Sequence, residues 1–319
     1  MSMKKSFRMI GLACVAMSVM PLVSCGGDDD GDVTPPNEIE TETGMRLTRV
    51  GNCEFNYDSK GRCNGVDYLG SSYDDSGNLS INWDKGEISV TDGDDAMYEN
   101  PLKFKTNGNG YITGLSQSWD YKDEYGSYKG NGEAKLSYDK SGHLTKATFE
   151  SKETGVDEGE KFSFYGKSVY SFTWQNGNLV RIENSWEDND DGERETGIES
   201  YDISYGNEEN AYNQWSQGIL YYAIEWDFSQ LGHVGMFGVG TANFPTTIEE
   251  NEDDYSHSYS LSFATNSLGL ISSENVNGST YNYYYDEVGT RAAFDQSLPA
   301  KAKKSLFMRY RKVIKLQQD

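Results

Sequence analysis

The chain has 319 residues, with 51 acidic side chains against 28 basic ones and a net charge of −23 at pH 7. This length is sufficient for one large domain or two small ones. Because the surface must be strongly acidic, nucleic acids and anionic lipid headgroups are poor partners, and no nucleic-acid ligand is expected.

The N-terminal segment has the pattern of a bacterial lipoprotein signal peptide. A basic head precedes the uncharged apolar stretch 9–23, and Cys25 follows almost directly. The apolar stretch is shorter than the ~20 residues of a membrane-spanning helix. We expect residues 1–24 to be removed and Cys25 to be acylated, which predicts an outer-membrane lipoprotein exposed at the cell surface. Residues 25–44, with consecutive Asp residues and a Pro-Pro pair, predict a flexible acidic tether.

A short unit recurs in the chain beyond residue 45. An alternating run leads to an Asp, a Gly follows three residues later, and an apolar residue starts the next run. The Asp side chain can accept hydrogen bonds from the backbone ahead of it, and the Gly can adopt a positive φ. Each copy therefore predicts one β-hairpin. The turn residues assigned in this way are Asp58, Gly61, Asp74, Gly77, Asp139, Gly142 and Gly177.

These hairpins predict an all-β domain over residues 45–290. Residues 255–263 alternate between Ser and larger side chains. This alternation indicates a strand with one face packed on the core and the other exposed to solvent. We expect an extended antiparallel β-meander that forms a twisted, curled sheet. A membrane-spanning barrel is not expected, because the strands lack a continuous apolar band. Helical spacing predicts a short helical insertion near 208–230 and a basic amphipathic helix over 295–319.

The repeat copies resemble the YD repeats of Rhs-type and teneurin-like shells, in a short and degenerate form. The chain as a whole looks like a family of Bacteroidetes surface lipoproteins that form a domain of unknown function. The acidic run after Cys25 resembles the surface-export signal of those bacteria, and the Gly-rich stretch 231–238 is a further likeness. The resemblance covers roughly residues 45–290, and it implies no catalytic residues.

Two cysteines, Cys53 and Cys63, lie within the expected domain. A turn at 58–61 would place Cys63 opposite residue 56 or 57. Cys53 would then be ~10–13 Å from Cys63, at ~3.3 Å per residue. A disulfide requires Cα atoms within ~7 Å, so we favour two free thiols.

An acidic cluster is the remaining candidate for metal binding. Glu187, Asn189 and Asp191 match the first ligand positions of an EF-hand loop when Gly192 takes its invariant glycine position, but Ile198 stands at the twelfth. A calcium site and an acidic hairpin tip are both compatible with this pattern. The histidines show no ligand spacing, and Ser and Asp are too abundant to single out a catalytic triad. No metal, cofactor or catalytic site is predicted.

The aromatic residues are the best candidates for ligand binding. Six tryptophans occur, at positions 83, 119, 174, 186, 215 and 226. Exposed aromatic rings beside Asn and Ser are typical of sugar-binding platforms, whereas packed rings would form cross-strand pairs. The sequence therefore predicts a non-enzymatic surface lipoprotein that serves as a binding or scaffold module for an extracellular glycan or protein. A periplasm-facing accessory lipoprotein is the alternative, and a polysaccharide-degrading enzyme is the third hypothesis.

Overall fold

The structure is a computed structural model. It describes residues 44–68, 77–92, 95–96, 100–122, 126–157, 160–223, 229–252 and 255–287. The expected signal peptide, Cys25, the tether and the basic helix over 295–319 therefore lie outside the described residues.

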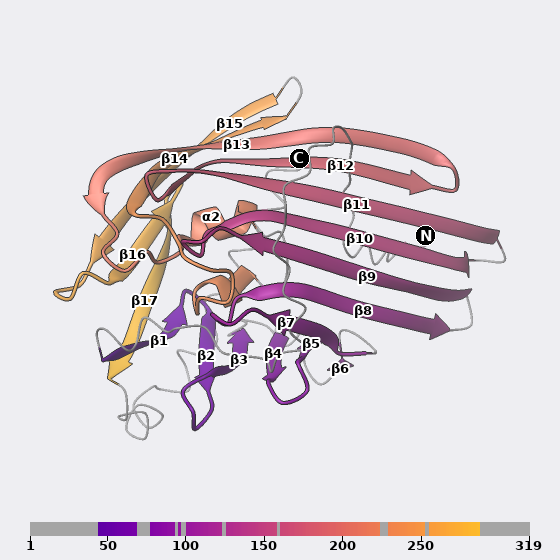
Figure 1. Cartoon of the computed structure of the whole chain (residues 1–319), viewed down its shortest axis with the longest axis horizontal. Coiled ribbons are helices and arrows are strands. Elements are labelled where there is room, and N and C mark those ends of the chain that lie inside the picture. Colours follow the sequence, from indigo (N-terminus) through magenta and orange to yellow (C-terminus); the bar gives the residue numbers. More distant parts are fainter. Residues whose placement is uncertain are drawn as a thin grey trace.

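The described chain consists almost entirely of β-strands (Figure 1). They are β1 (Met45–Val50), β2 (Cys53–Tyr57), β3 (Cys63–Tyr68), β4 (Gly77–Asn82), β5 (Glu87–Asp92), β6 (Asp95–Ala96), β7 (Leu102–Thr106), β8 (Ile112–Lys122), β9 (Gly126–Tyr138), β10 (Leu144–Asp157), β11 (Glu160–Gln175), β12 (Asn178–Asp190), β13 (Glu193–Glu209), β14 (Asn243–Glu252), β15 (Tyr255–Thr265), β16 (Ile271–Val276) and β17 (Ser279–Glu287).

The strands close into a barrel, so the expectation of an open, curled meander is wrong. The strands pair antiparallel in chain order, except that the short strand β6 pairs only with β5, and β5 also pairs with β7. The first and last strands also pair, with Met45 opposite Glu287 and Val50 opposite Tyr283. The result is a closed ring of 16 strands. Closure satisfies the backbone groups that an open meander would leave unpaired at its two edges.

Apolar side chains point into the barrel, and polar side chains point outward. In β11 the buried residues Tyr170 and Phe172 alternate with the exposed residues Ser171 and Thr173. The exposed positions of β9 are Lys129, Asn131, Glu133, Lys135 and Ser137. Strand β15 has the alternation predicted for residues 255–263, with Ser at its exposed positions. Among the described residues, the exposed large hydrophobic side chains are Ile198, Tyr221, Leu268 and Tyr284.

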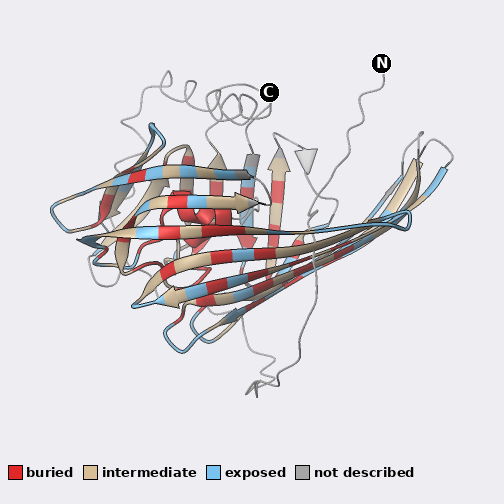
Figure 2. Cartoon of the chain, turned by 90° about the horizontal axis from the view of Figure 1, so that it is seen from above, coloured by how far each residue is buried: buried red, intermediate tan, exposed pale blue. Residues whose placement is uncertain are grey.

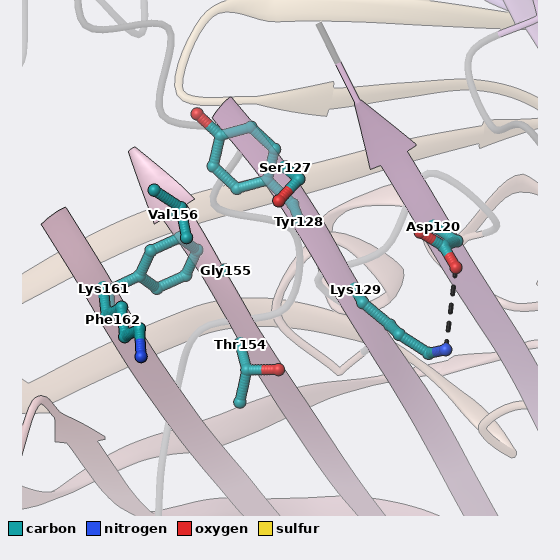
Figure 3. A pocket seen from close by; sticks show the side chains of 9 residues that line it. All are labelled: Asp120, Ser127, Tyr128, Lys129, Thr154, Gly155, Val156, Lys161 and Phe162. Atoms are coloured by element: carbon teal, nitrogen blue, oxygen red, sulfur yellow. Dashed lines mark ion pairs between the residues drawn. The ribbon is translucent and has the colours of Figure 1, made fainter. Parts of the chain in front are cut away.

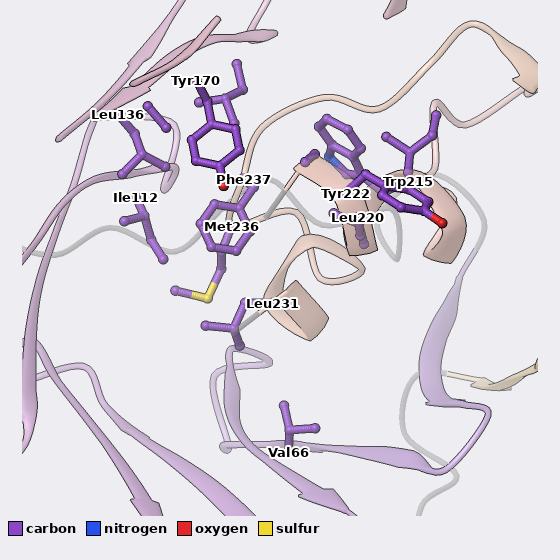
Figure 4. Packing of buried hydrophobic residues seen from close by; sticks show 14 of the residues in the cluster. Val66, Ile112, Leu136, Tyr170, Trp215, Leu220, Tyr222, Leu231, Met236 and Phe237 are labelled. Atoms are coloured by element: carbon purple, nitrogen blue, oxygen red, sulfur yellow. The ribbon is translucent and has the colours of Figure 1, made fainter. Parts of the chain in front are cut away.

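The lumen is filled by the segment between β13 and β14, which we call the plug (residues 210–242, of which 224–228 are not described). It contains the short helix α2 (Gln217–Ala223) and the 3-10 helix η1 (Ser229–Gly232). The helix α2 lies within the region 208–230 for which the sequence predicted a helical insertion. The plug residues at the centre of the core are Trp215, Ile219, Leu220, Leu231, Met236 and Phe237, each at most 2% exposed (Figure 4).

The Gly-rich part of the plug is held against the hairpin turns by backbone hydrogen bonds. The amide of Val239 donates to the carbonyl of Gly142 at 3.0 Å, and the amide of Ala242 donates to the carbonyl of Gly177 at 2.9 Å. The plug therefore closes the end of the barrel at which these turns lie. Among the described residues, no helix is both long and apolar enough to cross a membrane.

The two ends of the barrel differ. One end, which we call the turn end, gathers the turns after β2, β4, β7, β9, β11 and β15. Both described termini leave from it, because Met45 lies opposite Glu287. At the other end, β8 to β13 extend far beyond the plug as long hairpins, while buried residues gather around the plug (Figures 1 and 2). We call these distal parts the flare (residues 116–122, 126–133, 150–157, 160–168, 184–190 and 193–200).

Candidate functional site

The hairpin turns at the turn end share one geometry. The Oδ1 atom of Asp139 accepts hydrogen bonds from the backbone amides of Ser141 (2.8 Å) and His143 (3.0 Å). Gly142 lies between them with φ of +86°, in the left-handed region that favours glycine. The same pair of hydrogen bonds is made by Asp58, Asn107 and Asn266. These residues build the scaffold and do not form a ligand site.

The other glycines assigned to turns have different positions. Gly61 has φ of +84°, and Gly177 (φ +77°) follows Asn176 (φ +52°) in a two-residue hairpin turn. Gly77 is instead the first residue of β4 and lies opposite Asp92, so its assignment as a turn residue is wrong. Asp74 lies outside the described residues.

A buried carboxylate joins the plug to the barrel wall. Glu274 in β16 accepts hydrogen bonds from the Ser216 hydroxyl (2.6 Å), the amides of Gln217 (2.8 Å) and Gly218 (2.9 Å), and the Tyr283 hydroxyl (2.8 Å). Burial raises the pKa of Glu274, and the four hydrogen bonds oppose that rise. The amides lie at the start of α2, so Glu274 also satisfies donors that the helix itself leaves free. No local motif surrounds Glu274, so residue types and spacing alone do not single it out.

His233 in the plug belongs to the same polar cluster. Its Nε2 atom lies 2.8 Å from Oε1 of Gln217, and its ring packs edge-on against Phe55 and Tyr283. Complete burial lowers the pKa of His233 to about 3. The imidazole is therefore neutral at physiological pH and holds the plug in place. In this position it is enclosed by side chains of the core and has no open face toward a substrate.

The two cysteines of the barrel form no disulfide, as predicted, and both are buried. Cys63 lies opposite Tyr57, and Cys53 lies opposite Tyr68, at the far end of the same hairpin. Burial raises the pKa of the Cys53 thiol to about 12. A thiol with such a pKa is a poor nucleophile, so Cys53 is a structural residue.

The candidate calcium ligands occupy the tip of the β12–β13 hairpin, each with a partner within the protein. Glu187 forms an ion pair with Arg194 (Oε2 to Nη2, 3.0 Å). Asn189 and Asp191 accept hydrogen bonds from backbone amides at 3.0 and 2.6 Å. In the part of the chain that the structure describes, no group of three or more His, Cys, Asp or Glu could hold a metal ion. The geometry therefore favours the interpretation of this cluster as an acidic hairpin tip over its interpretation as a calcium site.

The tryptophans divide into two groups. Trp83 and Trp215 are buried in the core, and Trp174 is half-buried and donates to the carbonyl of Leu144. Trp226 lies outside the described residues. Trp119 and Trp186 stand apart, because they lie on the inner face of the flare, in phase with the inward residues of their strands. Among the described tryptophans, these two are the ones on the flare.

The first of these rings lies across a glycine of the neighbouring strand. Trp119 of β8 lies opposite Gly130 of β9, and a Cβ atom at Gly130 would overlap the indole ring. The indole Nε1 donates to Oε2 of Glu153 on β10 at 3.0 Å. Burial raises the pKa of Glu153 even though this hydrogen bond opposes the rise. The ring therefore packs against Gly130 and is held in place by its hydrogen bond to Glu153.

The second ring repeats this arrangement four strands further along the flare. Trp186 of β12 lies opposite Gly197 of β13, and a Cβ atom at Gly197 would overlap the indole ring. Between the two tryptophans, the inward positions of β9, β10 and β11 hold both small and large residues. The small ones include Gly132, Ser151, Gly166 and Ser168, and Glu153 lies opposite Phe164 at inward positions of β10 and β11. The inner face of the flare thus has two indole rings, each packed against a glycine of the neighbouring strand.

A cavity of about 400 Å³ lies at the tip of the flare (Figure 3). Its lining residues are Asp120, Ser127, Tyr128, Lys129, Thr154, Gly155, Val156, Lys161 and Phe162. The ring centroids of Tyr128 and Phe162 are 5.6 Å apart, with the ring planes tilted by 46°, and Asp120 pairs with Lys129 at 3.6 Å. The ion pair is largely exposed, and no nucleophile with an adjacent general base appears among the lining residues.

No known family model matches the chain, and no curated protein matches it. Several solved structures are similar, and two of them are porin-like proteins. A porin-like protein from Bacteroides uniformis is 15% identical, with a TM-score of 0.45, and the match covers 73% of this chain and 89% of that one. A porin-like protein from Bacteroides vulgatus is 13% identical, with a TM-score of 0.44, and the match covers 76% of this chain and 99% of that one. Because both TM-scores are below 0.5, the description of this chain as a barrel is based on its own strand pairing and not on these similarities.

Proposed function

We propose that the chain is a non-enzymatic, lipid-anchored binding protein of the outer membrane, exposed at the cell surface. In this proposal the filled barrel is a rigid scaffold, and the flare is the binding surface. The observation that carries the proposal is the arrangement of the two ends. Both described termini leave from the turn end, and the flare extends from the opposite end. If Cys25 is acylated, the turn end faces the membrane and the flare faces away from it.

The orientation of the side chains supports a barrel that stands in water. A barrel that spans a membrane has an apolar outer band and a polar or water-filled interior. Here Lys, Glu, Asn and Ser occupy the outward positions of β9, and the plug packs the interior with apolar side chains. The two similar structures are described as porin-like, and passage of solutes through this barrel would require the plug to leave its core.

Membrane fractionation tests the anchor. The wild-type protein should sediment with membranes, because each acyl chain contributes ~0.8 kcal/mol per buried CH₂. Cys25→Ala should be found in the soluble fraction, folded and without detergent. Cys14→Ala is the matched control, and it should remain with the membranes. Tight membrane retention of Cys25→Ala, or a need for detergent to keep it folded, would contradict the proposal.

Two further measurements test the surface location and the filled barrel. Protease added to intact cells should release fragments of the protein, whereas full protection would favour the periplasm-facing alternative. Purified protein added to planar lipid bilayers should give no steady channel conductance. Reproducible single-channel currents would show that the barrel is a membrane pore and that the proposed scaffold role is wrong.

A further inference from the structure

The turn end of the barrel presents lysines at the tips of its turns. Lys60 follows β2, Lys85 follows β4 and Lys140 follows β9, and all three side chains are exposed. Leu268, in the turn after β15, is 47% exposed and belongs to the exposed large hydrophobic side chains of the described residues. This end of the molecule therefore offers both cations and an apolar side chain to a surface that faces it.

Acidic side chains are also present at the turn end, but two of them are held within their turns. Asp58 forms an ion pair with Arg62 (Oδ2 to Nη2, 2.7 Å), and Asp139 accepts hydrogen bonds from the amides of Ser141 and His143. The other described acids at this end are Asp84, Glu208, Glu209, Asp286 and Glu287. The described part of the turn end thus has charges of both signs.

The hairpin tips at the opposite end of the barrel are acidic. The described acids at the tips formed by β10 to β14 are Asp157, Glu160, Asp190, Asp191, Glu193 and Glu252, with Lys161 and Arg194 as the described cations beside them. The net charge of −23 makes the whole chain a poor partner for anionic lipid, but the charge is unevenly distributed along the barrel. An anionic surface would repel the flare more strongly than the turn end.

The chain continues from the turn end into a strongly basic stretch. Strand β17 ends at Glu287, opposite Met45, and residues 288–319 follow, which we call the C-terminal segment. This segment has eight basic side chains against two acidic ones, and every Lys and Arg after Arg194 lies in it. The basic residues are Arg291, Lys301, Lys303, Lys304, Arg309, Arg311, Lys312 and Lys315. With this segment, the turn end becomes the basic end of the molecule.

The apolar residues of the C-terminal segment are spaced as on one face of a helix. Leu306, Phe307, Tyr310, Val313 and Ile314 recur at intervals of three and four residues. A basic amphipathic helix binds in the plane of a membrane, with its apolar side chains between the headgroups and its cations at the phosphates. The sequence of this segment is therefore suited to an anionic lipid surface.

A membrane at the turn end is nearer to the C-terminal segment than the acidic tips of the flare are. Lys301 is 14 residues beyond Glu287, so even a fully extended chain would place it at most ~50 Å from the end of β17. The 17 residues of β13 span ~56 Å between the turn end and the flare tip, at ~3.3 Å per residue. Binding to the tips of its own flare would therefore require a fully stretched connection, which is entropically costly.

We propose that the turn end makes a second, electrostatic contact with the membrane, in which the C-terminal segment and the lysines of the turn tips bind anionic lipid headgroups. This inference rests on the proposed function and names the lipid class that the membrane-facing end contacts. Because β1 begins opposite the end of β17, acylation of Cys25 would hold the C-terminal segment beside the membrane. Its effective concentration there is high, so a contact that is weak on its own still orients the barrel.

The test uses the purified mature chain without its lipid, produced as residues 26–319. This protein should co-sediment with vesicles of phosphatidylcholine and phosphatidylglycerol about tenfold more strongly than with vesicles of phosphatidylcholine alone. Raising the salt from ~0.1 M to ~1 M shortens the screening length from ~10 Å to ~3 Å and should release the protein. Because the contact is released by salt, Cys25→Ala should still be recovered in the soluble fraction of cells after a high-salt wash.

Two variants with equal loss of positive charge show whether the C-terminal segment makes the contact. The segment variant combines Lys303→Gln, Lys304→Gln, Arg311→Gln and Lys312→Gln. The control variant removes four exposed lysines of β9, β10 and β11 by combining Lys129→Gln, Lys135→Gln, Lys152→Gln and Lys161→Gln. The segment variant should bind the anionic vesicles about tenfold or more weakly, and the control variant should bind within about twofold of the unsubstituted chain.

A third variant tests the turn tips. Lys60→Gln, Lys85→Gln and Lys140→Gln together should weaken binding to the anionic vesicles by about threefold, because these lysines contribute to the contact from the described part of the barrel. Circular dichroism verifies the fold of each variant. The comparison of the two kinds of vesicle uses the unsubstituted chain, so it decides even if a variant fails to fold.

Three results would overturn the inference. They are equal binding to the two kinds of vesicle, binding that persists at ~1 M salt, and an affinity of the segment variant or the turn variant equal to that of the control variant. A C-terminal segment that stays on its own barrel would give the first of these results. The vesicle assay uses a chain without lipid, so its failure can be distinguished from a failure of acylation, which appears in the fractionation of the wild-type protein.

Discussion

The hydroxyl of Ser216 donates a 2.6 Å hydrogen bond to the carboxylate of Glu274, and both residues are buried. Ser216 precedes α2 in the plug, whereas Glu274 belongs to β16 in the barrel wall. This contact is therefore a joint between the plug and the wall, and not a contact within either. It explains why a carboxylate is retained in the core, where burial alone is costly.

Glu274→Ala should destabilise the protein strongly. The substitution leaves the donors of Ser216, Gln217, Gly218 and Tyr283 without their acceptor in a buried site. Unsatisfied buried donors cost ~1–3 kcal/mol each, so we expect a loss of about 3 kcal/mol or more in the free energy of unfolding, measured with urea. Glu133→Ala on the outer face of β9 is the control and should change it by less than about 0.5 kcal/mol. Equal effects of both substitutions would show that the joint does not stabilise the fold.

The stability of the barrel should fall in acid because of His233. Its pKa in the folded state is about 3, below the ordinary value of 6.5, so the unfolded chain binds a proton more readily than the folded protein. The stabilisation is complete above pH 6.5 and is lost as the pH falls toward 3, with a slope of up to ~1.4 kcal/mol per pH unit.

The raised pKa of Glu274 acts with the opposite sign, since its contribution is greatest below its ordinary pKa and is lost as the pH rises. The two effects are separated by comparing His233→Asn with the wild type. Urea unfolding between pH 4 and 7.5 should show a flatter acid limb for His233→Asn. Parallel profiles for the two proteins would mean that His233 is not the titrating group.

The hairpins could be read from the sequence because their determinants are local. The Asp139 side chain, the amides that it binds and Gly142 lie within five consecutive residues, so residue types and spacing suffice. The strand over 255–263 was readable for the same reason, since alternation is a local signal. The absence of a disulfide between Cys53 and Cys63 followed from the register of a single hairpin.

Closure and filling of the barrel could not be read in this way. The pairing of Met45 with Glu287 joins opposite ends of the described domain, and it depends on the twist accumulated over all the strands between them. The Gly-rich stretch 231–238 has no helical or strand periodicity, so nothing in the sequence indicated that it lies inside a barrel. The environments of the tryptophans also depend on how the barrel closes and where the plug lies. Trp215 is a core residue because it belongs to the plug, and Trp186 lies on the flare because β12 extends past the plug.

The buried thiols should resist alkylation in the native protein. Cys53 and Cys63 are 7% and 4% exposed, and burial raises the pKa of Cys53 to about 12, so little thiolate is present at pH 8. Iodoacetamide labelling followed by peptide mass spectrometry should show both peptides unmodified in buffer and fully modified in denaturant. Native labelling of either peptide as fast as in denaturant would indicate that the β2–β3 hairpin is not packed as described.

Gly142→Val should destabilise the protein more than Ser141→Val. Gly142 has φ of +86°, where a β-branched residue is strained by ~1–3 kcal/mol. A Cβ atom there would also lie 3.0 Å from the Tyr111 ring and from Cγ2 of Val239, so the plug would have to move away from the turn. Ser141 is exposed in the same turn and is therefore a matched control. Thermal unfolding followed by circular dichroism should give a clearly lower midpoint for Gly142→Val alone. Similar midpoints for the two variants would show that neither the positive φ nor the contact with the plug constrains residue 142.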